Sequence, residues 1–329
     1  MANLLDEASI LLVPNAYNNG SMLAVKPTNG DGDFTFSRNS AATRVNAQGL
    51  VENVASNLPR IDYTGGCGSL LLEPQSTNLY LNSDTLVTQS NATSASAYTV
   101  SFYGTGTITF SGTHTGTLVG TGLNDRVSVT FTATSGTLIS TISGSCTKGQ
   151  LENLTYATSY IPTQGAISTR LRDIANNSGN ASLINSEEGT LYAEIQAPND
   201  NVGGSDKLIT ISDGTINNRV TIGFKNVTNR AIVQVYASGI LQVSSTYIPI
   251  TQGNNNKLAF KYKLNNFSAW LNGVNVYNDT SGITPSIGVL NTLSFNRGVT
   301  TNNFYGKTKA VAVFKTALTD AQLTLLTTI

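Results

Sequence analysis

From Asn78 onward the chain consists of short runs in which apolar and polar residues alternate, with glycine-containing turns between them. Successive side chains of a β-strand point to opposite faces, so each alternating run predicts a strand with one buried face. Runs that follow one another at a regular spacing are typical of a β-sandwich. The first series covers residues 98–103, 107–110, 126–131 and 137–142.

A second series of runs begins after Gly189 and predicts a second sandwich. In one of these runs Phe260, Tyr262 and Leu264 alternate with polar or small residues, and we expect these three side chains to face the core. The runs of the second series are 190–197, 207–211, 219–224, 231–236 and 258–264.

The strongest hairpin signal lies between two further runs, 268–271 and 274–277, which flank Asn272-Gly273. A two-residue turn of this kind needs positive φ at both central residues, and Asn and Gly tolerate that conformation best. We therefore expect a tight β-hairpin here.

One short helix is expected after the last run, 310–314. Thr319 and Gln322 have the spacing of a capping box, and Leu318 and Leu323 are placed as a hydrophobic staple. The chain is therefore predicted to be all-β with a short C-terminal helix.

The N-terminal part has a different texture. Between Asp33 and Leu79, the apolar runs 34–36, 49–51 and 69–72 are set among Asn, Gly and Pro residues. This stretch predicts an ordered but irregular segment. Hydrogen bonds and ion pairs are expected to stabilise it more than a hydrophobic core of its own does. The residues available for those ion pairs are Arg38, Arg44, Arg60, Glu52, Asp62 and Glu73.

The same stretch carries a resemblance to known proteins. Its pattern SRNSAATRVNAQGLVENV, followed by PRIDY and LLLEPQSTNL, resembles a segment of bacteriophage virion proteins, mostly tail or head fibres and appendages, where it precedes carbohydrate-binding-type β domains. The resemblance implies that residues 1–75 attach the protein to the particle. In that case the attachment segment includes Arg38, Arg44, Arg60 and Glu73.

Two further resemblances concern the β series. The phrase that ends the first series, residues 149–163, resembles the last strand and exit of a small jelly-roll sandwich of the carbohydrate-binding-module type. The hairpin WLNGVNVY and the later VAVFKTALTDAQL resemble a concanavalin A-like, laminin-G-like sandwich. Together these features predict three parts: an attachment segment 1–75, a jelly-roll sandwich 76–165 and a concanavalin A-like sandwich 166–329.

Charge is balanced, with 19 basic and 19 acidic residues and only 12% of residues charged. A chain without a basic cluster has no electrostatic footprint for nucleic acid or for an anionic membrane. No apolar run approaches the roughly 20 residues that span a bilayer. The acidic start Met1–Glu7 lacks the basic region of an export signal, so we expect a virion component made in the host cytoplasm.

Catalytic chemistry is poorly represented. The only histidine, His114, lies in a predicted turn. Glycoside hydrolysis needs two facing carboxylates, and the first strand of the second series offers Glu194 alone. We therefore expect no enzyme, with a polysaccharide depolymerase as a distant alternative.

No cofactor is expected either. Asp31 and Asp33 form an Asp-x-Asp pair without the further carboxylates that a structural calcium ion needs. The two cysteines, Cys67 and Cys146, lack the spacing of a metal site. They are expected to be free thiols, and a disulfide between them is the alternative.

Sugar binding is the remaining candidate chemistry, because aromatic faces and planar amides can hold a sugar ring. Trp270, Tyr277, Tyr236 and Asn272 are the candidate residues, and the alternative for Trp270 is packing in the core. Two functions compete. The first is a structural or decoration component of a head or tail fibre, a homo-oligomer (trimer favoured) among other virion proteins. The second is a receptor-binding protein for host surface glycans.

Overall fold

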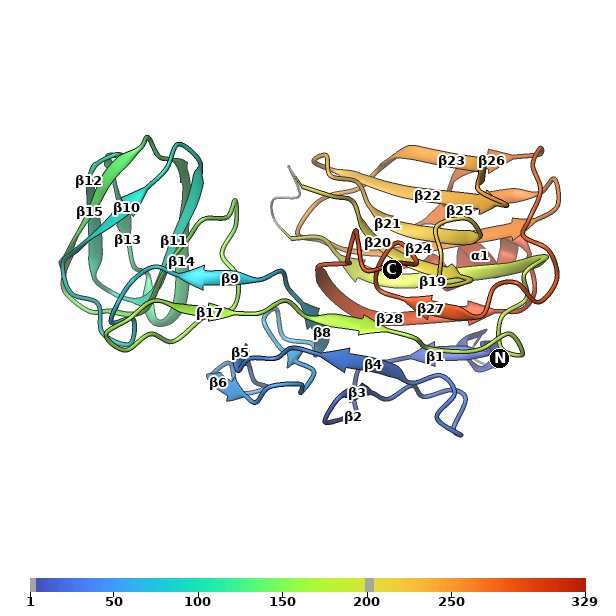
Figure 1. The fold of residues 1–329 in the computed structure, drawn as a ribbon, viewed down its shortest axis with the longest axis horizontal. Coiled ribbons are helices and arrows are strands. Elements are labelled where there is room, and N and C mark those ends of the chain that lie inside the picture. Colours follow the sequence, from blue (N-terminus) through green and yellow to red (C-terminus); the bar gives the residue numbers. More distant parts are fainter. Residues whose placement is uncertain (1–3, 199–203) are drawn as a thin grey trace.

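The computed structural model describes residues 4–198 and 204–329. Almost all of its regular structure is β, which confirms the predicted all-β class with one C-terminal helix, α1 (Asp320–Thr327). Figure 1 shows a large β-sandwich, a smaller lobe beside it, and an N-terminal segment that runs along one side. None of the helices in the described ranges has the length and apolar content required to span a membrane.

The large sandwich consists of two antiparallel sheets whose facing side chains form the main core. The first sheet contains, in spatial order, β26 (Val274–Asp279), β25 (Phe267–Leu271), β24 (Asn255–Lys263), β19 (Glu188–Gln196), β28 (Gly306–Phe314), β8 (Ser69–Leu72) and β7 (Ile61–Asp62), with β1 (Ile10–Leu12) also paired to β28. The second sheet contains β23 (Ile240–Pro249), β22 (Arg230–Ala237), β21 (Arg219–Phe224), β20 (Lys207–Ser212) and β27 (Thr292–Ser294).

The N-terminal segment contributes strands to the large sandwich. Ile10 pairs with Val313, and Leu70 pairs with Thr308. Ile10, Leu70 and Leu72 lie in the main core with at most 1% of their surface exposed. The N-terminal segment therefore contributes more to the hydrophobic core than the sequence analysis predicted. The four apolar or small residues of β8 are all buried, and their partner strand lies more than two hundred residues farther along the chain.

The small sandwich has its own core, whose residues all lie between Tyr80 and Leu151, inside the predicted range 76–165. One of its sheets contains β10 (Gln89–Thr93), β15 (Gly136–Ser143), β12 (Thr107–Gly112) and β13 (Gly116–Val119). The other contains β14 (Gly122–Thr132), β11 (Ala97–Gly104) and β16 (Cys146–Glu152).

The chain enters and leaves the small sandwich through one two-stranded ribbon, in which β9 (Ser76–Asn78) pairs with β17 (Ser168–Arg170). This ribbon is the link between the two lobes in Figure 1. Because β8 precedes the ribbon and β19 follows it, the small sandwich is an insertion into the large one.

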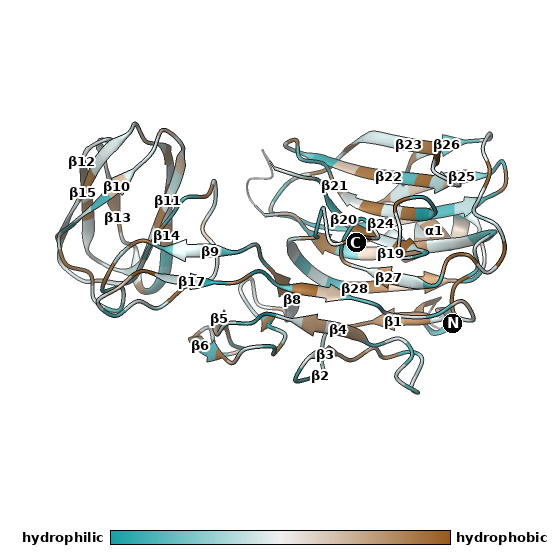
Figure 2. Ribbon diagram, viewed as in Figure 1, coloured by the Kyte–Doolittle hydropathy of each residue, from teal (hydrophilic) through white to brown (hydrophobic). Residues whose placement is uncertain are grey.

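The remaining strands lie along the side of the large sandwich on which β1 and β8 run, with β4 next to β1 (Figure 1). They are β18 (Ile174–Asn176), β4 (Phe34–Ser37), β3 (Ser21–Met22) and β2 (Tyr17–Asn18) in one sheet, and the hairpin of β5 (Ala42–Val45) with β6 (Val51–Val54). In Figure 2 β4 and β8 are coloured as hydrophobic, as expected for strands that pack on the core.

The local C-terminal predictions are confirmed. Asn272 and Gly273 have φ values of 49° and 85° in the turn between β25 and β26. The capping box between Thr319 and Gln322 is present. Both Leu318 and Leu323 are buried in a second cluster, which lies between α1 and the outer face of the first sheet.

One orientation predicted for β24 is wrong. Phe260 and Tyr262 are fully buried in the main core, but Leu264 is 58% exposed. β24 ends at Lys263, and Asn265 has a positive φ of 53°. Leu264 therefore belongs to the turn after the strand rather than to the alternating face.

Candidate functional site

A cleft of about 820 Å³ lies between the small sandwich and the large one. This volume is within the range of roughly 300–1,000 Å³ that is usual for ligand pockets. Three walls surround it. The first is formed by β11 and β14, the second by the loop 155–160, and the third by the hairpin β5–β6 with the edge of the large sandwich at residues 196–198 and 306–307.

The first wall presents the aromatic ring of Tyr103 with two cations close to it. The guanidinium of Arg126 lies 5.9 Å from the centre of the Tyr103 ring, and the ammonium of Lys148 lies at the same distance. Arg126 is fixed by donating hydrogen bonds to the Thr158 carbonyl (2.6 Å) and to the Ser101 hydroxyl (2.8 Å). Burial raises the pKa of Tyr103, so its phenol stays neutral at physiological pH.

Most of the carboxylates that line the cleft already have partners. Asp62 is 2.8 Å from the ammonium of Lys307 and accepts hydrogen bonds from the Val45 and Thr64 amides. Glu73 belongs to the ion-pair network described below. Within the described ranges, Asp125 is the one lining carboxylate without an ion pair, and it is exposed. The cleft therefore offers one unengaged carboxylate.

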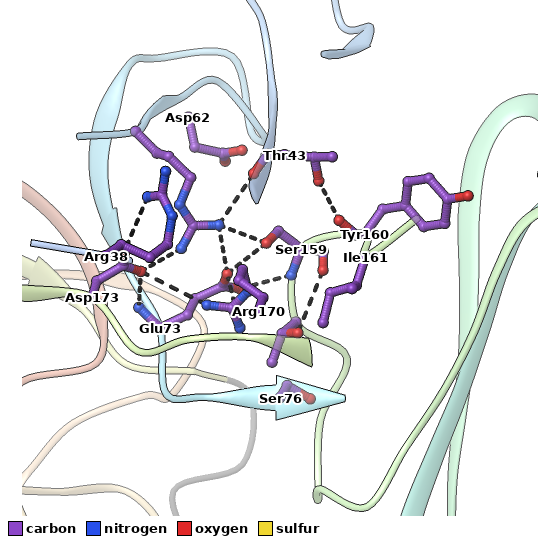
Figure 3. Close-up of polar contacts among 12 residues, drawn as sticks. Arg38, Thr43, Asp62, Glu73, Ser76, Ser159, Tyr160, Ile161, Arg170 and Asp173 are labelled. Carbon is purple, nitrogen blue, oxygen red and sulfur yellow. Dashed lines mark hydrogen bonds and ion pairs between the residues drawn. The ribbon is translucent and has the colours of Figure 1, made fainter. Parts of the chain in front are cut away.

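Beneath the cleft lies a buried network of three arginines and two carboxylates (Figure 3). Arg60 contacts Glu73 at 2.7 Å and also pairs with Asp173. Arg38 contacts Asp173 at 3.0 Å. Arg170 lies 3.5 Å from Glu73 and 3.8 Å from Asp173. The arginine side chains are completely buried.

The pairing decides the charge states. Burial opposes the ionised form of Glu73, but Arg170, Arg60 and hydrogen bonds from Ser159 lower the pKa of Glu73 well below its usual range. Burial likewise opposes the charge of Arg60, yet Asp173 and Glu73 raise the pKa of Arg60 overall. Glu73 and Arg60 are therefore both charged at moderate pH values.

The network joins the N-terminal segment to the small sandwich and to the chain that leaves it. Glu73 accepts hydrogen bonds from the Ser159 amide (2.8 Å) and hydroxyl (2.6 Å), which ties the loop of the small sandwich to the end of β8. Asn78 continues the connection by donating to the carbonyls of Gly149 and Ile161 at 2.9 Å each. These contacts hold the two sandwiches on either side of the cleft.

The predicted attachment residues occupy different places. Arg38, Arg60 and Glu73 are buried and have their partners within the chain, so their side chains are not available to contact a second protein. Their ion pairs agree with the other prediction, that these residues hold the segment together. Arg44 is partly exposed and pairs with Glu52 at 2.6 Å. An attachment role for residues 1–75 remains a prediction.

The predicted sugar-binding residues do not come together. Trp270 is 9% exposed and packs in the cluster beneath α1, so its ring is not free to stack on a sugar. Tyr277 donates its hydroxyl to Asp279 (3.0 Å). Asn272 accepts from the Lys257 amide (2.8 Å). Tyr236 lies on the other sheet, with the Arg219 guanidinium 3.6 Å from its ring centre.

Sequence reasoning missed Tyr103, Arg126 and Tyr156, which line the cleft. A signal was present at Arg126, because a charged residue in a strand of a weakly charged chain is unusual. Nothing in the local pattern places Tyr156 in the same site, since the cleft forms only when two lobes meet.

The other candidates have structural environments. Cys67 is exposed and Cys146 is buried, and both are free. His114 stacks on Phe131 with ring centres 3.9 Å apart, and burial lowers the pKa of its imidazole. Asp33 accepts a hydrogen bond from the Ala24 amide. Within residues 4–198 and 204–329, no three His, Cys, Asp or Glu residues gather as metal ligands.

No family model and no curated protein matches this chain. Solved structures with a related shape include the Ruminococcus gnavus IT-sialidase CBM40 bound to α2,3-sialyllactose. It has 18% identity, covers 47% of this chain and 94% of that one, and gives a TM-score of 0.38. Domain 4 of the Geobacillus stearothermophilus GH43 arabinanase AbnA, in complex with arabinotriose, has 13% identity, coverages of 53% and 80%, and a TM-score of 0.39.

A heptameric SAP-like pentraxin from Limulus polyphemus has 13% identity, covers 43% of this chain and 70% of that one, and gives a TM-score of 0.32. The TM-scores of all three likenesses lie below 0.5. They therefore assign neither a detailed fold nor a ligand to this chain, and the function is argued from its own residues.

Proposed function

We propose that the protein is a non-catalytic carbohydrate-binding protein that holds a glycan in the cleft between its two sandwiches. The observation that carries this proposal is the cleft itself, which combines the aromatic rings of Tyr103 and Tyr156 with the hydrogen-bonding side chains of Asn124, Arg126 and Gln196. Aromatic rings pack against the C–H faces of sugars, and polar groups placed around them fix the orientation of the ligand.

Binding rather than cleavage is favoured by the state of the carboxylates. A glycosidase needs an acid and a second carboxylate on opposite sides of the scissile bond. Two of the three acidic residues that line the cleft, Asp62 and Glu73, are held in ion pairs. Asp125 alone does not supply the pair.

The setting that we propose is a bacteriophage particle, on which the protein acts as a fibre or appendage component that contacts host surface glycans. The support for this setting is the resemblance of residues 37–79 to segments of virion proteins. Assembly as a homo-oligomer with other virion proteins remains part of the proposal. A purely structural role in a head or tail fibre is the second candidate, and the same resemblance favours it.

The test is retention of the full-length protein on immobilised bacterial surface polysaccharides, with released oligosaccharide measured in the same samples. We expect retention without product release. Tyr103→Ala should weaken retention about tenfold, as expected for losing one contact worth more than about 1 kcal/mol. Because the cleft contains no histidine, retention should change little between pH 5 and 8.

Tyr247→Ala is the matched control, since Tyr247 is a 79% exposed tyrosine on β23, outside the cleft. It should bind like the wild type. Loss of retention in Tyr247→Ala but not in Tyr103→Ala would move the site to the large sandwich. Product release would contradict the non-catalytic function, and absence of retention on every polysaccharide would leave the structural role.

A further inference from the structure

A buried arginine with unused hydrogen-bond donors lies on the five-stranded sheet, away from the cleft. Arg219 at the start of β21 is 1% exposed, and its Nη1 donates to the Ile216 carbonyl. Among the described residues, its Nε and Nη2 are buried and form no hydrogen bond of good geometry, and Tyr236 is the side chain that partly compensates the guanidinium. Leaving charged donors unsatisfied in the interior is costly, and buried charges are normally paired.

A second arginine adds to this unbalanced charge. Burial and the positive charge of Arg297 lower the pKa of Arg219, while Tyr236 acts in the opposite direction. Among the residues that the structure describes, neither arginine forms an ion pair. The nearby Asp213 is occupied within its own loop, where it accepts hydrogen bonds from Thr215 and Asn218.

The surroundings of Arg219 are polar and aromatic. Ser212, Arg219 and Tyr236 are cross-strand partners on three adjacent strands, so their side chains share the face of the sheet opposite the core. The Arg219 guanidinium lies over the Tyr236 ring. Gly298, next to Arg297, is packed so closely on Ser212 that a β-carbon there would lie 3.0 Å from its hydroxyl oxygen.

The two unpaired donors of Arg219 indicate which kind of ligand would satisfy them. Nε and Nη2 are the two donors that point in parallel from one side of a guanidinium, and this fork matches the two oxygens of a planar carboxylate. We propose that Arg219 and Arg297 form a binding site for an oxyanion, specifically an organic carboxylate, for which glucuronate serves as the probe. Tyr236 holds the guanidinium of Arg219 in place from one face.

This site is separate from the cleft, because none of the residues that line the cleft belongs to the five-stranded sheet. Its test therefore does not depend on the proposed glycan binding there. The full-length protein is titrated with sodium glucuronate, with glucose, and with sodium sulfate at constant ionic strength, and binding is read from the shift in Tm and from calorimetry. A ligand that binds the folded state raises Tm with its concentration.

We expect a saturable shift with glucuronate, none with glucose, and a weaker one with sulfate. Arg297→Gln should weaken glucuronate binding about tenfold, as expected for a lost charged contact of about 1.5 kcal/mol. Arg219→Lys, which keeps the charge but loses the fork, should weaken it as well. Arg230→Gln is the control, because Arg230 lies on the neighbouring strand and its guanidinium donates to the Asn229 carbonyl.

Tighter binding of sulfate than of glucuronate would overturn the assignment of a carboxylate. Absence of a saturable shift with either anion, or equal binding by wild type and Arg297→Gln, would overturn the site. Arg297 is only partly buried, so Arg297→Gln removes no core side chain and is expected to fold. A loss of binding in this variant can therefore be assigned to the site. Tyr103→Ala should bind glucuronate like the wild type.

Discussion

The arginines beneath the cleft show, at the scale of single residues, how a chain with few charges uses them. Arg38, Arg60 and Arg170 have fully buried side chains around Glu73 and Asp173. Removing one member of a buried ion pair leaves its partner uncompensated and costs about 3–5 kcal/mol. The network is therefore a point where single substitutions have large effects.

Glu73→Gln tests the network through its pH dependence. In the unfolded chain the pKa of a glutamate is about 4.3, and in the folded protein the pKa of Glu73 is lower. The unfolded state therefore binds the proton more readily, so the carboxylate stabilises the fold above about pH 4.3 and loses this contribution as pH falls. At pH 7 the variant should be about 3–5 kcal/mol less stable than wild type.

The measurement is urea unfolding of both proteins at pH 7, 5, 4 and 3. The difference in free energy of unfolding should narrow as the pH falls below 5. A difference that stays constant down to pH 3 would contradict the assignment. Glu52→Gln is the control, because its pair with Arg44 is partly exposed and such pairs contribute only about 0–1 kcal/mol.

At the scale of single elements, α1 is the clearest case of a feature that the sequence specifies locally. Its capping box and staple lie within five residues of one another, and the structure contains both. What the pattern did not reveal is the face that the helix covers. The staple residues lie in the same buried cluster as Trp270 of β25. Only the tertiary fold brings β25 to the helix.

Leu323→Ala tests this packing with a specific readout. Leu323 is fully buried in the cluster that contains Trp270, the only tryptophan of the chain. The substitution should cost about 2–5 kcal/mol and shift the tryptophan emission to longer wavelength as water reaches the ring. Leu325→Ala on the same helix is the matched control, because Leu325 is 63% exposed.

The control should stay within about 0.5 kcal/mol of wild type, as surface substitutions usually do. Unchanged emission and stability in Leu323→Ala would mean that α1 does not cover Trp270 in solution.

The orientation of Leu264 was predicted wrongly because the sequence pattern does not show where β24 ends. Apolar and polar residues still alternate past Lys263 in the sequence, but the chain turns at Asn265.

At the scale of the whole molecule, the class of fold follows from alternation and turn chemistry, which act over a few residues. The pairing of β1 and β8 with β28 cannot be predicted from such local features, because these strands are far apart in the sequence. Residues 69–72 are a short apolar run with no partner nearby in the sequence, so their burial in the large sandwich was hidden. The cleft was hidden for the same reason, because residues from both sandwiches meet only after the insertion returns through β17.

This architecture gives the segment that resembles virion proteins a structural meaning. Its polar residues Arg60, Glu73 and Asn78 help to join the two sandwiches at the base of the cleft. An exposed residue of the segment, rather than these, would have to contact a particle. We propose that these contacts hold the two lobes together so that they form one glycan site.

The most direct test of that claim is hydrogen–deuterium exchange of the full-length protein with and without a polysaccharide on which it is retained. We predict slower exchange of amides in residues 124–130 and 155–160, which contain the lining of the cleft from the small sandwich, and no change in β23, residues 240–249. Slower exchange confined to β23, or to any region outside the cleft, would contradict the account.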